Sequence, residues 1–164
     1  MLSPPLPFTS YSGSVRTSSE ISPSAHPGSW KGAPHQVLVI DDDETVLSVS
    51  AILLGRAGLN VSTAKDGEAG WDATVRQTFD LIVTDNDMPK LRGLDLIRRL
   101  RAADYCAPIV LISGGMLPDD RLLIPLLGQG AVLPKPFSGR ELVSLVQRLL
   151  NAPLANIEAQ ARAC

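Results

Sequence analysis

The sequence predicts an α/β fold, an open and doubly wound sheet of five parallel strands with helices on both faces. From residue 37 to residue 150, short apolar segments alternate with helical patterns, which is typical of consecutive βαβ units. Four of the five apolar segments are nearly continuous, as expected for strands covered on both faces. Right-handed crossovers leave few ways to connect such units. We therefore predict the strand order 2-1-3-4-5, one of the two common orders.

The predicted strands are short and consist mostly of β-branched or aliphatic residues. They lie at residues 37–40, 61–64, 81–84, 109–112 and 131–133. The second strand is the least apolar of the five, so we place it at an edge of the sheet, where less of its surface is covered.

Helices are predicted between the strands, and most have a recognisable start or end. They lie at residues 44–57, 68–77, 94–103, 118–127 and 139–150. Gly58 can follow the first helix as its terminating residue, and Asp66 or Gly67 can open the second. Ser138 and Glu141 form a capping-box pattern at the start of the last helix.

Composition and length indicate one folded domain with tails. Residues 1–35 are rich in Ser, Pro and Gly, so we expect a disordered leader, or residues upstream of the native start codon. The leader has neither the apolar core of a signal peptide nor the arginines of a mitochondrial presequence. The folded domain is predicted at residues 36–151, followed by a short tail at residues 152–164.

The charge, apolar segments and cysteines exclude several classes of protein. A net charge of −2 provides no basic surplus for a phosphate backbone, so we expect no nucleic-acid binding. No apolar segment approaches the roughly 20 residues that cross a bilayer, so no membrane insertion is expected. Cys106 and Cys164 show no CxxC spacing and no histidine partner, so we predict neither a disulfide framework nor a zinc site. Such cysteine usage is consistent with a protein of the reducing cytoplasm.

Polar side chains follow the predicted strands at their carboxyl ends. They are Asp41 and Asp42 after the first strand, Asp85 and Asp87 after the third, Ser113 after the fourth and Lys135 after the fifth. Open α/β sheets bind ligands beyond these ends, where the strand order reverses. The first and third strands are neighbours in the predicted order, so Asp41, Asp42 and Asp85 should converge on one pocket.

Converging carboxylates predict a cation, and the residues around them indicate phosphoryl chemistry. Carboxylates that repel one another take up protons or bind a cation, and ligands that offer only oxygen favour Mg²⁺. Asp85 could then be a nucleophile that forms an acyl phosphate, while Lys135 and Ser113 bind the phosphoryl oxygens. A helix cap alone would explain Asp43, and a loop or turn would explain any one of the others. Their joint position at strand ends favours the site.

Four motifs in this order resemble the receiver domains of two-component response regulators. They are VLVIDDDE, DLIVTDNDMPKLRGLDLI, IVLISGG and LPKPF, within residues 37–150. The resemblance implies a flavodoxin-like fold in which Asp85 is phosphorylated. It also implies that the carboxylates of Asp42 and Asp85 and the backbone carbonyl of Asp87 ligate Mg²⁺, while Asp41 acts on the ion through water.

The resemblance also assigns roles to residues on the fourth and fifth strands. Ser113 corresponds to the family's hydroxyl residue, which turns toward the phosphoryl group. Lys135 corresponds to the family's lysine at the end of the fifth strand, and the resemblance implies a cis peptide bond between Lys135 and Pro136. The sequence departs from the family at Val132, where an aromatic ring is usual. An output signal carried by such a ring is therefore not expected here.

The fourth helix is an alternative route for the output signal. Pro125 lies inside it and should kink it. Its leucines form an apolar set that could be an interface, although a role in the core is the commoner one for such residues. This set comprises Leu122, Leu123, Leu126 and Leu127.

The resemblance implies a phosphoryl donor that is a histidine kinase or a phosphotransfer protein. We expect a stand-alone receiver, a monomer or weak homodimer, that signals to an unknown downstream protein. It would be no enzyme beyond self-catalysed phosphotransfer and dephosphorylation. Asp87 lies near the expected line of water attack, and Gly115 opposite it has no side chain, so we hypothesise a short-lived acyl phosphate.

Two other functions remain open from the sequence. One is a pseudo-receiver that binds proteins without being phosphorylated, although all the ligand-type residues are present. The other is a haloacid-dehalogenase-type phosphatase, because Asp85-Asn86-Asp87 forms a DxD motif after a strand. In that family the motif normally follows the first strand, where this sequence already carries an acidic pair.

Overall fold

The computed structural model describes residues 33–115 and 120–151 of the chain. The predicted leader, at residues 1–35, lies almost entirely outside the described residues, as does the tail at residues 152–164. The described part contains five parallel strands in the order β2-β1-β3-β4-β5, so the predicted fold class and strand order are confirmed.

The strands have the predicted positions with small extensions. They are β1 (Gln36–Ile40), β2 (Asn60–Ala64), β3 (Leu81–Asp85), β4 (Ile109–Ser113) and β5 (Ala131–Pro134). Two residues of the predicted site, Asp85 and Ser113, are therefore the last residues of their strands and not the first residues of the loops. The edge strand β2 is largely exposed or half-buried, as its polar composition predicted.

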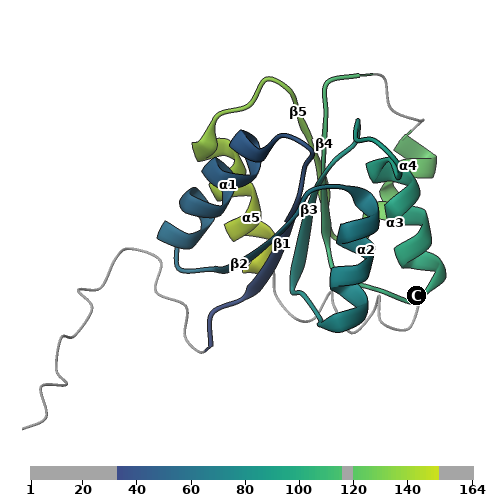
Figure 1. The fold of residues 1–164 in the computed structure, drawn as a ribbon, viewed down its shortest axis with the longest axis horizontal. Coiled ribbons are helices and arrows are strands. Elements are labelled where there is room, and N and C mark those ends of the chain that lie inside the picture. Colours follow the sequence, from purple (N-terminus) through teal and green to yellow (C-terminus); the bar gives the residue numbers. More distant parts are fainter. Residues whose placement is uncertain (1–32, 116–119, 152–164) are drawn as a thin grey trace, which may run out of the picture.

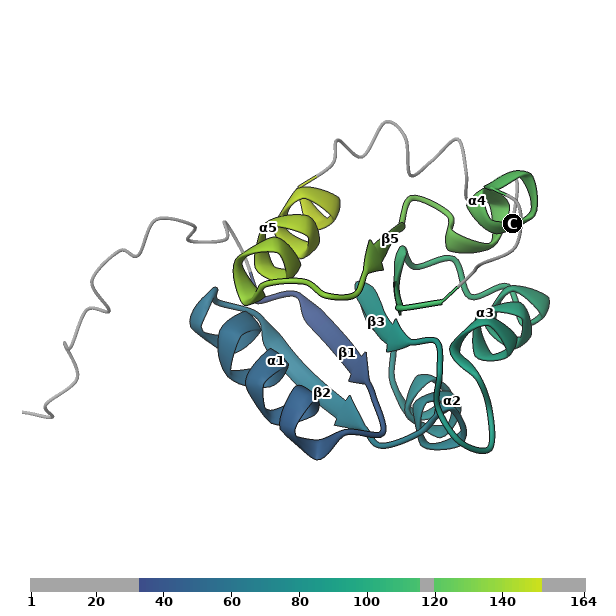
Figure 2. The ribbon, with the colours of Figure 1, turned by 90° about the horizontal axis from the view of Figure 1, so that it is seen from above.

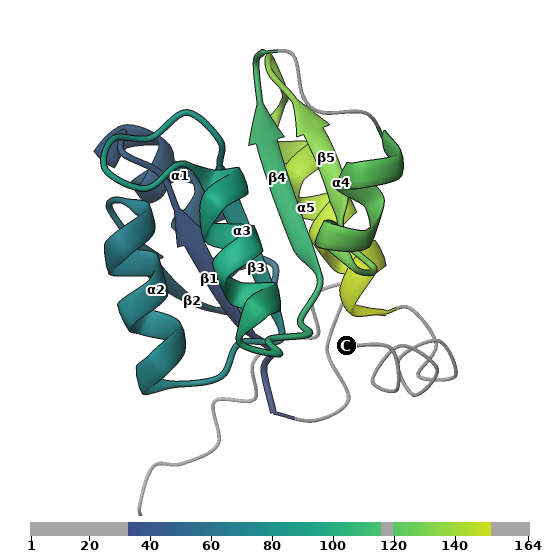
Figure 3. The same ribbon diagram turned by 90° about the vertical axis from the view of Figure 1, so that its right-hand side faces the viewer.

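Helices cover both faces of the sheet (Figure 1). They are α1 (Glu44–Arg56), α2 (Gly67–Arg76), α3 (Gly93–Ala102), α4 (Asp120–Leu127) and α5 (Gly139–Leu150). Helices α1 and α5 lie on one face, and α2, α3 and α4 lie on the other (Figure 3). On the described residues the predicted boundaries agree with these or differ by one residue, because capping residues and the last helical turn are hard to separate by sequence. The predicted start of the fourth helix, at residue 118, lies outside the described residues.

The core consists of two apolar layers, one on each face of the sheet. Successive residues of β1 alternate between them, with Val37 and Val39 facing α1 and α5 and Leu38 and Ile40 facing the other three helices. All four side chains are at most 2% exposed. This double coverage explains why the strand sequences are continuously apolar.

The predicted helix signals are present as hydrogen bonds. Asp43 accepts from the Thr45 N–H at 2.7 Å, and Asp66 accepts from the Ala69 N–H at 2.8 Å. Ser138 makes the complete capping box at the start of α5. Helices α1 and α5 therefore begin where the sequence predicted and α2 begins one residue earlier, which fixes the loops that precede them.

Two further findings concern the bilayer and the cysteines. Among the described residues, we find no helix with the length and apolar character needed to cross a membrane. Cys106 is disulfide-bonded. The sequence did not predict a disulfide, because spacing along a chain does not report separation in the fold.

Candidate functional site

The pairing of β1 with β3 brings two buried aspartates to the same edge of the sheet. Ile40 is paired with Thr84, so the next residues, Asp41 and Asp85, lie side by side at the carboxyl ends of neighbouring strands. Asp41 is 3% exposed and Asp85 is 2% exposed. Figure 2 shows this arrangement of the strands from above, with β1 between β2 and β3. The predicted convergence of these two residues is thus present.

The carboxylate of Asp41 is only partly compensated. Its Oδ1 accepts a hydrogen bond from the Asp43 N–H at 2.9 Å, whereas its buried Oδ2 has no hydrogen-bond partner. Burial raises the pKa of Asp41, and the charges of Asp85 and Asp42 raise it further, against the opposing effect of that hydrogen bond. The pocket therefore favours a proton or a cation beside Asp41.

Asp85 is held from two sides. Its Oδ2 accepts a hydrogen bond from the Asp87 N–H at 2.8 Å, and its Oδ1 lies 2.6 Å from Lys135 Nζ. Burial acts to lower the pKa of Lys135, but the contact with Asp85 outweighs this effect, with help from Asp41, and the pKa is raised. Lys135 is thus a fixed cation directly on the carboxylate that the sequence identified as a nucleophile.

Ser113 and the lysine loop come from the two strands beyond β3. Asp85 is paired with Ile112, so Ser113 follows one residue later on β4 and is 4% exposed. Its Oγ accepts a long hydrogen bond from the Gly115 N–H at 3.3 Å. The backbone N–H of Lys135 donates to the Ser113 carbonyl at 2.9 Å, and the peptide bond after Lys135 is cis, as expected.

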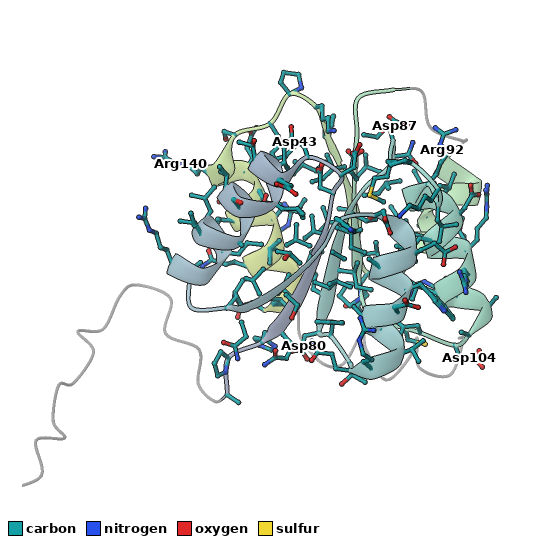
Figure 4. The ribbon with its side chains drawn as sticks, viewed as in Figure 1. Asp43, Asp80, Asp87, Arg92, Asp104 and Arg140 are labelled. Atoms are coloured by element: carbon teal, nitrogen blue, oxygen red, sulfur yellow. The ribbon has the colours of Figure 1, made fainter. Side chains whose placement is uncertain are left out.

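Asp42 and Asp87 are exposed, unlike the two buried carboxylates. Asp42 affects the site through its charge on Asp41. The side chain of Asp87 turns toward α3, where its Oδ1 lies 2.8 Å from Arg92 Nη2 and 3.1 Å from Asn86 Nδ2 (Figure 4). Sequence reasoning did not identify Arg92, because a single arginine in a loop carries no motif.

The residues present fit a magnesium ion, although the described residues contain no ready-made group of three Asp, Glu, His or Cys side chains for a metal. One buried carboxylate oxygen, Asp41 Oδ2, lacks a hydrogen-bond donor, and Asp85 Oδ1 beside it is paired with Lys135 alone. Mg²⁺ prefers oxygen ligands and keeps several of its waters, so it needs few protein ligands. Two carboxylates, a backbone carbonyl and water are sufficient.

The loop between β3 and α3 is fastened to its surroundings at both ends. Lys90 has a left-handed backbone, with φ of 67°, and its Nζ lies 2.5 Å from Oδ2 of the buried Asp66. Gly93 opens α3 directly against the end of β3, where an added Cβ would lie 2.2 Å from the Asp85 carbonyl oxygen. This loop carries Asp87, so both contacts help to place the predicted site.

Where the structure describes them, the residues considered for signal output are buried or half-buried. Val132 is half-buried and packs against the layer beneath α2, α3 and α4. Leu123 and Leu127 are 2% and 4% exposed, so for these two the role in the core, which we considered the commoner one, is confirmed. Among the side chains of α4 that the structure describes, Ile124 is a large apolar one that is exposed, at 63%.

Comparisons with known proteins agree with this geometry. A family model of the response regulator receiver domain matches residues 37–147. The transcriptional regulatory protein CpxR of Escherichia coli is 35% identical over 116 residues, which cover 71% of this chain and 49% of CpxR. The alkaline phosphatase synthesis transcriptional regulatory protein PhoP of Bacillus subtilis is 34% identical over 115 residues, 70% of this chain and 48% of PhoP. The chain spans about half the length of the curated relatives it matches.

Solved structures give the same result. The receiver domain of the Francisella response regulator 1452 is similar with a TM-score of 0.65 and 27% identity, covering 71% of this chain and 96% of that domain. The chemotaxis protein CheY4 of Vibrio cholerae is similar with a TM-score of 0.64 and 28% identity, covering 71% and 99% of the two chains.

Proposed function

The chain belongs to the family of response regulator receiver domains, and from this we propose that it accepts a phosphoryl group on Asp85 in a reaction that requires Mg²⁺. The observation that carries the proposal is the setting of Asp85. Its carboxylate is buried, lies 2.6 Å from Lys135 Nζ, and is held in place by the Asp87 N–H. This arrangement orients a carboxylate oxygen toward the edge of the sheet, where ligands of such folds bind.

The surrounding side chains have separate tasks in this reaction. An oxygen of Asp85 forms a bond to phosphorus as the bond between phosphorus and the donor breaks. Lys135 then offsets charge on the phosphoryl oxygens, and the Ser113 hydroxyl donates a hydrogen bond to one of them. Fixed groups of this kind favour the transition state because they need no rearrangement.

The magnesium ion would be held by the side chains of Asp42 and Asp85 and the backbone carbonyl of Asp87, with Asp41 acting through a water. The unpartnered Oδ2 of Asp41 supports this role, since it lies buried next to Asp85 without a donor. When bound, Mg²⁺ neutralises phosphoryl oxygens and aligns them with the nucleophile.

The phosphoryl donor is a histidine kinase or phosphotransfer protein, and the phosphorylated domain acts on a downstream protein, as a monomer or weak homodimer in the cytoplasm. This proposal applies to the domain at residues 36–151. The curated relatives are transcriptional regulatory proteins. The expectation of no nucleic-acid contact therefore stays a prediction for the whole protein.

The acyl phosphate is short-lived in this proposal. Asp87 has an exposed carboxylate and donates its backbone N–H to Asp85, and a Cβ added to Gly115 would meet no atom of the described residues within 4 Å, so we expect water to have access. Replacing Asp87 with methionine should lengthen the lifetime of the phosphorylated protein. A lifetime that stays the same or shortens would contradict this part of the proposal.

Labelling with acetyl phosphate tests phosphorylation directly. Wild-type protein should gain one phosphoryl group in the presence of Mg²⁺ and none after chelation, as measured by intact-protein mass spectrometry. Asp85→Asn should abolish the label, whereas Asp95→Asn, on the exposed face of α3, should retain it. No label on the wild type would favour the pseudo-receiver, and steady turnover of phosphomonoesters would favour the phosphatase.

A further inference from the structure

Arg92 connects the rim of the site to the start of α3. Its Nη2 lies 2.8 Å from Oδ1 of Asp87, and the same oxygen accepts a hydrogen bond from Asn86 Nδ2 at 3.1 Å. The backbone N–H of Asp87 meanwhile donates to Asp85 Oδ2. One residue therefore touches the phosphoacceptor through its backbone while its side chain is held toward α3 by Arg92 (Figure 4).

At the end of β4, we find no equivalent restraint among the described residues. Gly115, whose N–H donates to Ser113 Oγ, presents no side chain, and a Cβ built there would meet no atom of the described residues within 4 Å. We therefore expect water to approach from this side. Asp87 follows Asp85 by two positions in the chain, and its carboxylate is exposed to solvent. The direction in which Asp87 points thus decides whether a proton acceptor stands beside the incoming water.

We propose that Arg92 is a positioning residue that slows hydrolysis of the acyl phosphate by holding the carboxylate of Asp87 away from the attacking water. The inference rests on the proposed phosphorylation of Asp85. It adds a restraint that no motif of the sequence marks, formed between the end of β3 and the start of α3.

The hydrolysis step shows why the position of Asp87 matters. The water oxygen forms a bond to phosphorus while the bond from phosphorus to the Asp85 oxygen breaks, and that electron pair restores the Asp85 carboxylate. One proton of the water passes to the carboxylate of Asp87 and then to solvent, and inorganic phosphate leaves. The guanidinium of Arg92 on Asp87 Oδ1 fixes the direction of this carboxylate and so keeps it from the position in which it would accept that proton.

The exposure of the pair limits the size of the effect. The side chains of Arg92 and Asp87 are 62% and 52% exposed, so water screens their attraction. Pairs of this kind shift an equilibrium by a factor of about two to five. We therefore expect Arg92→Ala to shorten the lifetime of the phosphorylated protein by about two- to five-fold.

The test compares phosphoryl lifetimes in a double-mutant cycle. The protein is first labelled with acetyl phosphate in the presence of Mg²⁺. Rapid desalting then removes the excess acetyl phosphate and Mg²⁺. Mg²⁺ is added back, and the loss of the phosphoryl label is followed with time. Arg92→Lys keeps the positive charge and should recover part of the wild-type lifetime. Arg98→Ala is the matched control, since Arg98 lies on α3, which begins directly after Arg92, in an ion pair of equal length with Asp95.

The expected outcome is specific to Asp87. Arg92→Ala should shorten the lifetime in the wild-type background and leave it unchanged in the Asp87→Met background, while Arg98→Ala has no effect in either. An unchanged or longer lifetime in Arg92→Ala, or equal shortening in both backgrounds, would overturn the inference and leave the proposed function standing. A wild-type protein that takes up no label would overturn both.

Discussion

Replacing Lys90 with alanine should destabilise the protein by about 1.5 kcal/mol, because it removes the partner of a buried carboxylate. Asp66 is 5% exposed and Lys90 is 62% exposed, at a distance of 2.5 Å. Hydrogen bonds to charged groups contribute roughly 1.5 to 3 kcal/mol, and exposure of the lysine places this pair at the lower end. Asp66 would keep its bond from the Ala69 N–H, so the start of α2 should persist.

Glycine at the same position separates the ion pair from the backbone. Lys90 has a φ of 67°, a left-handed conformation that costs a residue with a Cβ about 1 to 2 kcal/mol. Alanine retains this cost and glycine does not. Lys90→Gly should therefore be about 1 kcal/mol more stable than Lys90→Ala, although both lack the ammonium group.

The pH dependence of the stability difference shows whether Asp66 is the group that Lys90 stabilises. The hydrogen bond from Lys90 is the largest cause that lowers the pKa of Asp66 below its ordinary value of 3.8. The pair therefore stabilises the fold fully above that value, and its contribution is lost as the pH falls through the lower folded-state pKa. The difference in the free energy of unfolding between the wild type and Lys90→Ala should therefore decrease at acidic pH.

Urea unfolding followed by far-UV circular dichroism measures all three proteins at neutral pH and at about pH 3. Equal stability of Lys90→Ala and Lys90→Gly would refute the backbone argument. If the difference in the free energy of unfolding between the wild type and Lys90→Ala were the same at both pH values, the ion-pair argument would be refuted.

Two further predictions concern the site. In the absence of Mg²⁺ and near neutral pH, Asp41→Asn should raise the free energy of unfolding by about 1 kcal/mol. The reason is that burial and the charge of Asp85 raise the pKa of Asp41, so its ionised form is disfavoured in the fold. Thermal unfolding without metal measures this effect, and a melting temperature below that of the wild type would contradict it. Gly93→Ala should destabilise by more than about 2 kcal/mol and slow labelling, since its Cβ would lie 2.2 Å from the Asp85 carbonyl oxygen. Gly55→Ala, in open space on α1, should instead stabilise by up to about 1 kcal/mol, and similar losses in both variants would reject the steric explanation.

Much of the fold was predictable because its signals are local. The continuous apolar strands indicated a sheet covered on both faces, and Asp66 and Ser138 indicated where α2 and α5 begin. The placement of Asp41 beside Asp85 also followed from the sequence, since parallel neighbouring strands end at one edge. Lys135 could be assigned to the same edge for this reason, although its distance from Asp85 could not.

The contacts between loops required the tertiary structure. Lys90 and Asp66 are separated by 24 positions, and nothing in either segment identifies the other as its partner. The pairing of Arg92 with Asp87 depends on how α3 starts against β3, which the close approach at Gly93 permits.

The sequence by itself thus determined the class of fold, and it predicted the edge of the sheet for the candidate site and the residue types there, because strand and helix patterns repeat along the chain. The tertiary structure alone decided which charged side chains meet and which leucines of α4 are buried, as Leu123 and Leu127 are. The physical reason is that hydrophobic periodicity indicates which face of an element is apolar, while the partner of each side chain depends on how separate elements pack.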